Sequence, residues 1–278
     1  METLKSELLT DDVTYGEGPR WHDGRLWFTD GMVDLIKTVD EAGKVEVVVE
    51  TNHPSGLGWL PDGTLVLCTL QSPHVMRVVD GEVSLIHDFA EYGWSTNDMV
   101  VSPEGRIYTD VYEMGDNQTI TGRIGLIAPD GDVRIVAEGM STPNGLAITP
   151  DGRTLIVADS FASAIYAFTI TDDGGLVDRR IFADLGERKP DGICLDEEGA
   201  VWVGLYDSSE FVRILDGGEI THRVPCPGAW AVATALGGAD RRTLFLIIND
   251  TDYEGMASNR SDGRIETVRV DVPGAGWP

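Results

Sequence analysis

The chain has 278 residues, of which 42% are hydrophobic, so it can bury a large core and is not disordered throughout. Its 47 acidic and 21 basic side chains give a net charge of -26 at pH 7, which argues against nucleic acid and membrane surfaces as partners. No apolar run has the length of a membrane helix or of a signal peptide, so we expect a cytoplasmic protein.

From the N-terminus onward one pattern recurs: a short apolar run, a turn formed by an acidic residue and a glycine, and a second apolar run. Its first three copies are centred on Asp23-Gly24, Asp62-Gly63 and Glu104-Gly105. The next copies are centred on Asp151-Gly152, Glu198-Gly199 and, in degenerate form, Asp240. Successive turns are about 39, 42, 47, 47 and 42 residues apart, a spacing typical of the four-stranded blades of a propeller.

Each copy is predicted to be a β-hairpin. Acidic-Gly pairs supply the positive φ that a tight hairpin turn needs, and the flanking runs, such as Leu65–Thr69 and Val201–Leu205, suit strands. A second hairpin, such as the one around Asp80-Gly81, follows most copies. Two hairpins per repeat make one four-stranded blade.

The chain ends before the sixth blade is complete. Little sequence follows the strand predicted within residues 264–272, so we expect the N-terminal strand near Ser6–Leu9 to supply the missing strand and close the ring. The expected fold is therefore all-β: a six-bladed β-propeller of four-stranded antiparallel blades, in a single domain spanning residues 1–278.

One position in the repeat is polar in five of the six copies, where an apolar residue would be ordinary. It lies seven residues before the turn (six in the first copy) and is occupied by Glu17, Ser55, Asn97, Asn144, Asp191 and Ala233. The innermost strands of a propeller surround its axis, so carboxylates and amides at this level converge and need a partner. A divalent cation is a suitable partner, because hard cations prefer oxygen ligands. Turn chemistry alone could explain an isolated Asn-Gly or Asp-Gly pair.

Four motifs at these positions occur together and in a specific order: Gly16-Glu17-Gly18-Pro19-Arg20-Trp21, Asn97-Asp98, Thr142–Leu146 and Lys189–Ile193. With them the chain resembles the senescence marker protein 30, gluconolactonase and luciferin-regenerating enzyme family over nearly its whole length. The resemblance implies a six-bladed calcium-type propeller, usually a lactone hydrolase, whose metal ligands match Glu17, Asn144 and Asp191. Asn97 matches a residue that reaches toward the substrate and often the metal, and Asp191 matches the family's acid/base residue.

The chemistry of the residues agrees with that function. A divalent cation can polarise a lactone carbonyl, and a carboxylate beside it, Asp191, can take the proton of the attacking water and return it to the leaving alkoxide. We expect one bound cation, with Ca²⁺ favoured and Mg²⁺, Mn²⁺ and Zn²⁺ left open.

Substrate contacts are expected in the loops at the same rim. The candidates are Asn97, Ser95, Tyr112, Glu113, Phe161 and Tyr206, with Met32 and Met114 nearby and Trp21 and Trp94 as apolar walls. Ser95 stands where sugar-lactone relatives commonly carry an arginine that grips substrate hydroxyls. Loss of that donor makes a less polar lactone plausible beside a sugar lactone.

Two further classes of function remain open for this sequence. The same cation could serve a hydrolase of aryl esters or phosphotriesters, or the propeller could bind a ligand without catalysis. A small-molecule substrate is the expected partner, and the oligomeric state is left open.

Overall fold

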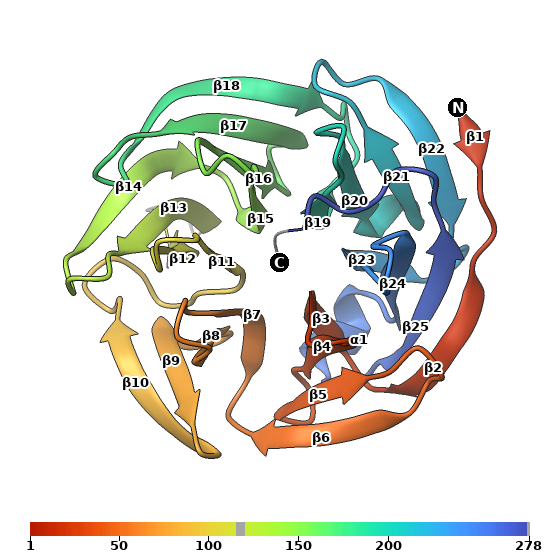
Figure 1. Ribbon diagram of the computed structural model, residues 1–278, viewed down its shortest axis with the longest axis horizontal. Helices are drawn as coiled ribbons and strands as arrows, with labels where there is room; N and C mark the ends of the chain where they lie inside the picture. Colours follow the sequence, from red (N-terminus) through yellow and green to blue (C-terminus); the bar gives the residue numbers. More distant parts are fainter. Residues whose placement is uncertain (115–119, 277–278) are drawn as a thin grey trace.

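The computed structural model describes residues 1–114 and 120–276. Almost all of its regular structure is β, arranged as six sheets around one central axis, with the innermost strand of each sheet facing the axis (Figure 1). The predicted six-bladed propeller is therefore confirmed. No helix in the described part of the chain is both long and apolar enough to cross a membrane.

The blades follow one another in chain order, each running from the innermost to the outermost strand. Blade 1 contains β3 (Gly16–His22), β4 (Arg25–Asp30), β5 (Leu35–Val39) and β6 (Val45–Glu50). Blade 2 contains β7 (Pro54–Trp59), β8 (Leu65–Thr69), β9 (His74–Val79) and β10 (Glu82–Asp88). Blade 3 contains β11 (Met99–Val101), β12 (Ile107–Met114), β13 (Ile120–Ile127) and β14 (Val133–Met140).

The second half repeats this order. Blade 4 contains β15 (Pro143–Ile148), β16 (Thr154–Asp159), β17 (Ala164–Ile170) and β18 (Leu176–Asp184). Blade 5 contains β19 (Pro190–Leu195), β20 (Val201–Leu205), β21 (Glu210–Ile214) and β22 (Ile220–Pro225), with the 3₁₀ turn η1 (Tyr206–Ser208) between β20 and β21. Blade 6 contains β23 (Trp230–Gly237), β24 (Thr243–Asp250) and β25 (Asp262–Arg269), with the short helix α1 (Tyr253–Ala257) before β25.

The N-terminal segment completes the ring. Strand β2 (Glu7–Val13) pairs antiparallel with β25 as the outermost strand of blade 6, as predicted from the missing strand. Strand β1 (Glu2–Thr3) continues to the neighbouring blade and pairs parallel with β22, which gives blade 5 a fifth strand that the sequence pattern did not indicate.

The hydrophobic core lies between the blades. The described residues form six apolar clusters, and each cluster joins two neighbouring blades. Phe28 of blade 1, for example, packs in one cluster with Phe245 and Ile247 of blade 6, and all three are fully buried. Burial of this kind is the main favourable contribution to folding, so each blade is held by its two neighbours.

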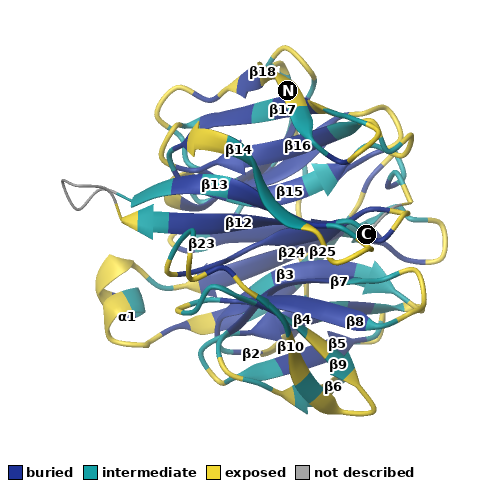
Figure 2. Ribbon diagram, turned by 90° about the vertical axis from the view of Figure 1, so that its left-hand side faces the viewer, coloured by how far each residue is buried: buried dark blue, intermediate teal, exposed yellow. Residues whose placement is uncertain are grey.

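The two faces of the ring differ in what they carry. The innermost strands begin at the face that carries η1 and α1, which we call the entrance face. The hairpin turns between the first and second strands lie at the opposite, far face, together with the C-terminal residues (Figure 2). The residues predicted to bind metal lie near the start of the innermost strands, so they belong to the entrance half of the central tunnel.

A recurring bulge sets the direction of these residues. In five of the six innermost pairs the register shifts near the start of the strand, for example between Pro143 and Leu146 and between Pro190 and Ile193. Asn144 and Asp191 lie inside these shifts. A bulge re-aims a side chain and increases the local twist, which is how neighbouring polar residues can turn toward the axis.

Candidate metal and catalytic site

Four predicted residues lie at the entrance half of the tunnel, one from each of four blades. The Asn97 Nδ2 donates to Asn144 Oδ1 at 3.2 Å, so blades 3 and 4 meet at the axis. Asn97 Oδ1 accepts from Ser55 Oγ of blade 2 at 2.9 Å. Burial and then the charge of Asp191 raise the pKa of Glu17, so these two side chains lie near each other. We call Glu17, Asn97, Asn144 and Asp191 the axial cluster.

Asp191 provides the clearest sign of a missing partner. It is 6% exposed, and its Oδ1 atom is buried without a hydrogen bond in the described structure. A carboxylate oxygen buried in this way is costly, because its hydration is lost and nothing replaces it. The atom is therefore available to a ligand bound at the axis.

The pKa values of the cluster reflect crowded negative charge. Burial raises the pKa of Glu17 well above its usual value, and the neighbouring charges of Asp191 and Asp98 raise it further. Burial also raises the pKa of Asp191 to about 8, with a contribution from Asp98 that the Asn144 side chain and the Gly192 N–H partly offset. A bound cation would reverse both shifts, because it favours the ionised carboxylates.

Buried carboxylates on the second strands of blades 3 and 4 hold the axial cluster in place. In blade 3, Asp110 Oδ1 accepts from the Asn97 N–H at 2.6 Å and Oδ2 accepts from the Asp98 N–H at 3.1 Å. In blade 4, Asp159 accepts from the Ser141 and Thr142 N–H groups at 2.9 and 2.7 Å. Both acids have no exposed surface, so the segments that carry Asn97 and Asn144 are rigidly placed.

Glycines next to the axial residues let neighbouring blades approach closely. A Cβ atom on Gly145 would lie 2.5 Å from the Asp191 carbonyl oxygen and 2.7 Å from the Ile193 nitrogen. A Cβ on Gly192 would lie 2.4 Å from the Ala233 Cβ. Only glycine fits where two backbones approach this closely, so the glycines of the Asn-Gly and Asp-Gly pairs serve packing between blades as well as local geometry.

An ion pair crosses the tunnel beyond the axial cluster. Arg20 Nη2 lies 3.2 Å from Asp98 Oδ1 and also donates to the Met99 carbonyl at 2.7 Å. Arg20 therefore joins blade 1 to blade 3 and neutralises one of the acidic side chains near the cluster.

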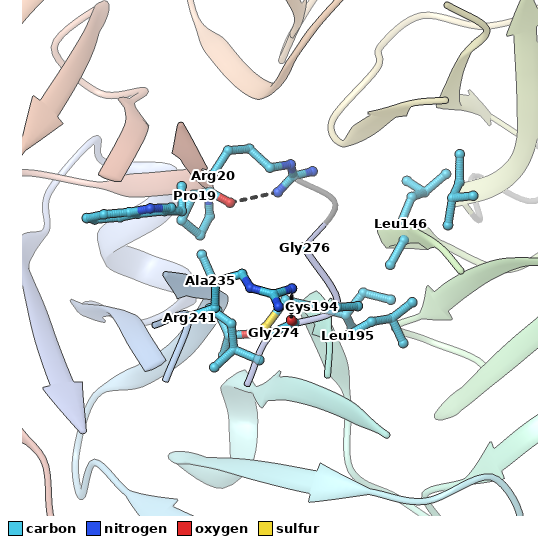
Figure 3. Close-up of a pocket in the computed structure, with 16 residues that line it drawn as sticks. Pro19, Arg20, Leu146, Cys194, Leu195, Ala235, Arg241, Gly274 and Gly276 are labelled. Carbon is cyan, nitrogen blue, oxygen red and sulfur yellow. Dashed lines mark hydrogen bonds between the residues drawn. The ribbon is translucent and has the colours of Figure 1, made fainter. Parts of the chain in front are cut away.

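A cavity of about 100 Å³ lies on the far side of this pair. Arg20 and Leu146 contribute to its wall, and the C-terminal segment at Gly274–Gly276 crosses it (Figure 3). The Arg241 Nη1 donates to the Gly274 carbonyl at 2.8 Å and holds that segment. Trp21, expected at the mouth, also lines this far cavity and stacks on Phe245, so that expectation is wrong.

The predicted substrate contacts have different environments. Ser95 has no exposed surface, and its hydroxyl accepts from the Gln71 N–H and donates to the Thr96 carbonyl, so we assign it a structural role. Glu113 pairs with Arg123 at 2.5 Å. Tyr112 is buried beside the axial cluster and donates to the Pro143 carbonyl at 2.8 Å. Tyr206 is buried and Phe161 is half exposed, both near Lys189.

Three residues at the mouth were not singled out from the sequence. Lys189 lies two positions before Asp191, and Trp230 and Tyr253 come from blade 6. The Trp230 ring lies 5.2 Å from that of Tyr206 and 5.3 Å from that of Tyr253. The Tyr253 hydroxyl accepts from Lys189 Nζ at 3.3 Å. Only the position of Lys189 inside a recognised motif could have drawn attention to it.

The donor set of the axial cluster fits a hard divalent cation. The described residues contain no group of three or more His, Cys, Asp or Glu side chains arranged for a metal ion. The cluster instead combines two carboxylates with two amides, and the unpartnered Asp191 Oδ1 is one of its oxygens. Carboxylate and amide oxygens without sulfur or imidazole suit Ca²⁺ or Mg²⁺ better than a dedicated zinc site.

Comparison with known proteins finds a matching family model, similar curated proteins and similar solved structures. A family model described as SMP-30/Gluconolactonase/LRE-like region matches residues 15–248. The pentonolactonase XacC of Haloferax volcanii is 28% identical over 98% of this chain and 96% of its own length. A Xanthomonas campestris gluconolactonase structure aligns with a TM-score of 0.77 at 25% identity over 96% of this chain and 89% of its own. An Agrobacterium tumefaciens structure, described as a calcium-binding protein, regucalcin, aligns with a TM-score of 0.82 at 21% identity over 100% and 98%.

Proposed function

The chain belongs to the SMP-30/gluconolactonase/LRE-like family, and on that premise we propose that it hydrolyses sugar lactones with one divalent cation bound at the axial cluster. The relatives named as a pentonolactonase and a gluconolactonase support the class of substrate. The position of the axial cluster near the start of the innermost strands supports a reaction in the entrance half of the tunnel, because the C-terminal segment crosses the far end.

One observation carries the proposal: the buried Asp191 Oδ1 has no partner, and the pKa values of Asp191 and Glu17 are both raised. A protein that only needed a packed core would have apolar residues here, as blade 6 has at Ala233. Groups that are expensive to bury and have no protein partner are expected where a ligand completes them.

Glu17, Asn144 and Asp191 would hold the cation, with Asn97 beside them. The bound cation supplies electrophilic chemistry, since it polarises the lactone carbonyl and stabilises the charge that develops on its oxygen. Ca²⁺ is the first choice, because the ligands are carboxylates and amides, and the relative described as calcium-binding supports it.

Asp191 would act as the base and then as the acid. It accepts a proton from the water that attacks the ring carbonyl carbon. When the ring C–O bond breaks, Asp191 returns the proton to the departing alkoxide, and the product is an open-chain hydroxy acid. Asp110 and Asp159 would hold the segments that carry Asn97 and Asn144 in position during these steps, because their carboxylates accept from the N–H groups of Asn97 and Thr142 just before β11 and β15.

A hydrolysis screen under control of the metal tests the proposal. The purified protein is treated with chelator, and proton release from D-glucono-1,4-lactone is followed before and after Ca²⁺, Mg²⁺, Mn²⁺ or Zn²⁺ is added. Turnover that disappears with chelator and returns with one of these cations supports the proposal. Phenyl acetate and an organophosphate triester are the comparison substrates. Their faster turnover, or no turnover of any lactone with any of the four cations, would contradict it.

A further inference from the structure

Lys189 stands among aromatic side chains from three blades at the entrance face. Its Nζ lies 5.1 Å from the centre of the Phe161 ring, 5.9 Å from that of Tyr206 and 5.8 Å from that of Tyr253. Aromatic faces attract an ammonium ion and limit the positions of its flexible stem. The ammonium group of Lys189 is therefore held in place, although 28% of the lysine side chain is exposed.

The ammonium group keeps binding capacity for a further partner. It donates to the Tyr253 hydroxyl at 3.3 Å, and this is its one hydrogen bond to the described residues. The nearest carboxylate oxygen, Asp207 Oδ2, lies 4.0 Å away, beyond hydrogen-bond distance. Asp207 uses its other oxygen to accept from the Lys189 N–H at 3.1 Å, so it positions the backbone of the lysine. An ammonium has three N–H donors, so two remain available.

The site around Lys189 adjoins the axial cluster. Lys189 precedes Asp191 by two residues, a separation of about 7 Å along an extended chain. Tyr206 is near both residues: its ring centre lies 5.9 Å from Lys189 Nζ, and the charge of Asp191 contributes to its raised pKa after burial and the Tyr253 hydroxyl. A small ring at the axis could therefore extend one substituent to the ammonium.

The nearby aromatic rings offer a surface for the carbon atoms of such a molecule. Phe161 is 50% exposed and Tyr253 is 59% exposed, both in connections of the entrance face. The site thus combines an immobilised cation with accessible apolar faces. In a chain with a net charge of -26, a local cation is what an anionic substrate needs in order to approach the mouth.

We infer that Lys189, Phe161 and Tyr253 form a subsite for a carboxylate group on the lactone substrate, so that the preferred substrate is the lactone of a sugar diacid. The ammonium binds the carboxylate, the two rings contact the carbon chain, and the lactone carbonyl lies at the axial cluster. The inference rests on the proposed function, of which it specifies the substrate.

A pair of matched substrates tests the subsite. D-glucaro-1,4-lactone and D-glucono-1,4-lactone share ring and stereochemistry but carry a carboxylate and a hydroxymethyl group, respectively, at the last carbon. The wild-type protein should have the higher kcat/KM on the glucarolactone. Lys189→Met keeps most of the stem and removes the charge. It should lower kcat/KM about tenfold or more on the glucarolactone, and no more than about threefold on the gluconolactone.

Two further variants control for damage to the fold. Lys189→Arg keeps the charge and should retain most of the preference for the glucarolactone. Arg188→Met removes a charge from the neighbouring residue, whose Nε donates to the Leu185 carbonyl, and should leave both substrates within about twofold of wild type. Equal loss on both substrates in Lys189→Met, or a wild-type preference for the gluconolactone, would overturn the inference.

Binding decides the case if the protein opens neither lactone. The thermal midpoint is then measured with D-glucarate and with D-gluconate, at equal ionic strength. Glucarate should raise the midpoint of the wild type more than gluconate does, and Lys189→Met should remove the difference. If the midpoints with glucarate and gluconate differ as much in Lys189→Met as in the wild type, the subsite is overturned. If the difference disappears in Lys189→Met, the subsite is supported even though hydrolysis has failed.

Discussion

Asp98 of blade 3 and Arg20 of blade 1 form an ion pair across the tunnel, with Oδ1 and Nη2 3.2 Å apart and both side chains no more than 10% exposed. Burial alone would hold the pKa of Asp98 high, and the charge of Arg20 counteracts part of that effect. The two residues are separated by 78 positions in the chain. The pair therefore joins blades 1 and 3, which are not neighbours in the ring.

Removal of one partner of this pair should lower the free energy of unfolding more than removal of both partners does. Arg20→Met leaves Asp98 buried without its counter-charge and should lower the free energy of unfolding by about 3–5 kcal/mol. The double variant Arg20→Met/Asp98→Asn leaves no unpaired charge, so its free energy of unfolding should fall by less. Urea denaturation with chelator present measures both. If Arg20→Met loses under about 1 kcal/mol, the pair is not the stabilising contact described here.

A titration of lactone turnover with Ca²⁺ should distinguish the metal ligand from the base within the axial cluster. Asn144→Ala removes a neutral ligand, so it should raise the Ca²⁺ concentration for half-maximal lactone turnover while much of kcat returns at saturation. Asp191→Asn keeps a ligand oxygen but removes the base, and its kcat should stay at least about 100-fold low at any Ca²⁺ concentration. Near-wild-type kcat of Asp191→Asn at saturating Ca²⁺ would refute the proposed base.

The metal-free protein should lose stability as the pH rises. The pKa of Asp191 is about 8 in the fold and about 3.9 in an unfolded chain, so between these values the native state holds a proton that the unfolded state has released. Its contribution is complete below about pH 4 and is lost as the pH rises through about 8, with a slope of up to about 1.4 kcal/mol per pH unit.

Chemical denaturation from pH 5 to pH 9 with chelator measures this slope. Asp191→Asn, which cannot titrate at this position, is the matched control and should show a flatter profile. Calcium should stabilise the wild type more at pH 8 than at pH 5, because it competes with the proton for the same oxygens. A slope identical in the wild type and Asp191→Asn would contradict the assignment.

The close approach of blades 4 and 5 can be tested with one methyl group. Gly145→Ala places a Cβ against the Asp191 carbonyl, so we expect a loss of about 3 kcal/mol or more in unfolding free energy and weaker binding of Ca²⁺. Gly63→Ala is the control, because its Cβ meets no atom within 4 Å and only its φ of 85° is unfavourable. It should cost about 1 kcal/mol and leave Ca²⁺ binding unchanged. Equal losses in the two variants would contradict the packing role.

The architecture could be predicted because it follows from local signals that repeat. Acidic-Gly turns such as Asp62-Gly63 recur at a regular spacing, and hydrophobic runs flank each turn. The axial residues could be predicted for the same reason, since Asn144 and Asp191 occupy equivalent places in successive repeats. The closure by β2 followed from a count of strands, and the structure confirms it.

Other features depend on contacts between irregular segments. Lys189 and Tyr253 come from connections of different blades, and no common spacing relates them. The interaction of Arg20 with Asp98 depends on the diameter of the tunnel, which a repeat does not reveal. Ser95 was expected to contact the substrate because sugar-lactone relatives carry an arginine at this position, but both hydrogen bonds of its hydroxyl are to backbone groups, those of Gln71 and Thr96. Strand β1 is two residues long and too short to leave a pattern.

The pairing of β2 with β25 has a consequence for biosynthesis. Thr10 is matched with Ile265, so β2 must wait until all the strands between it and β25 have been translated before its partner exists. During that interval an unpaired strand could join the wrong sheet or another nascent molecule. The strand reads Glu-Leu-Leu-Thr-Asp-Asp-Val, and its three acidic side chains should discourage such encounters until the last blade emerges.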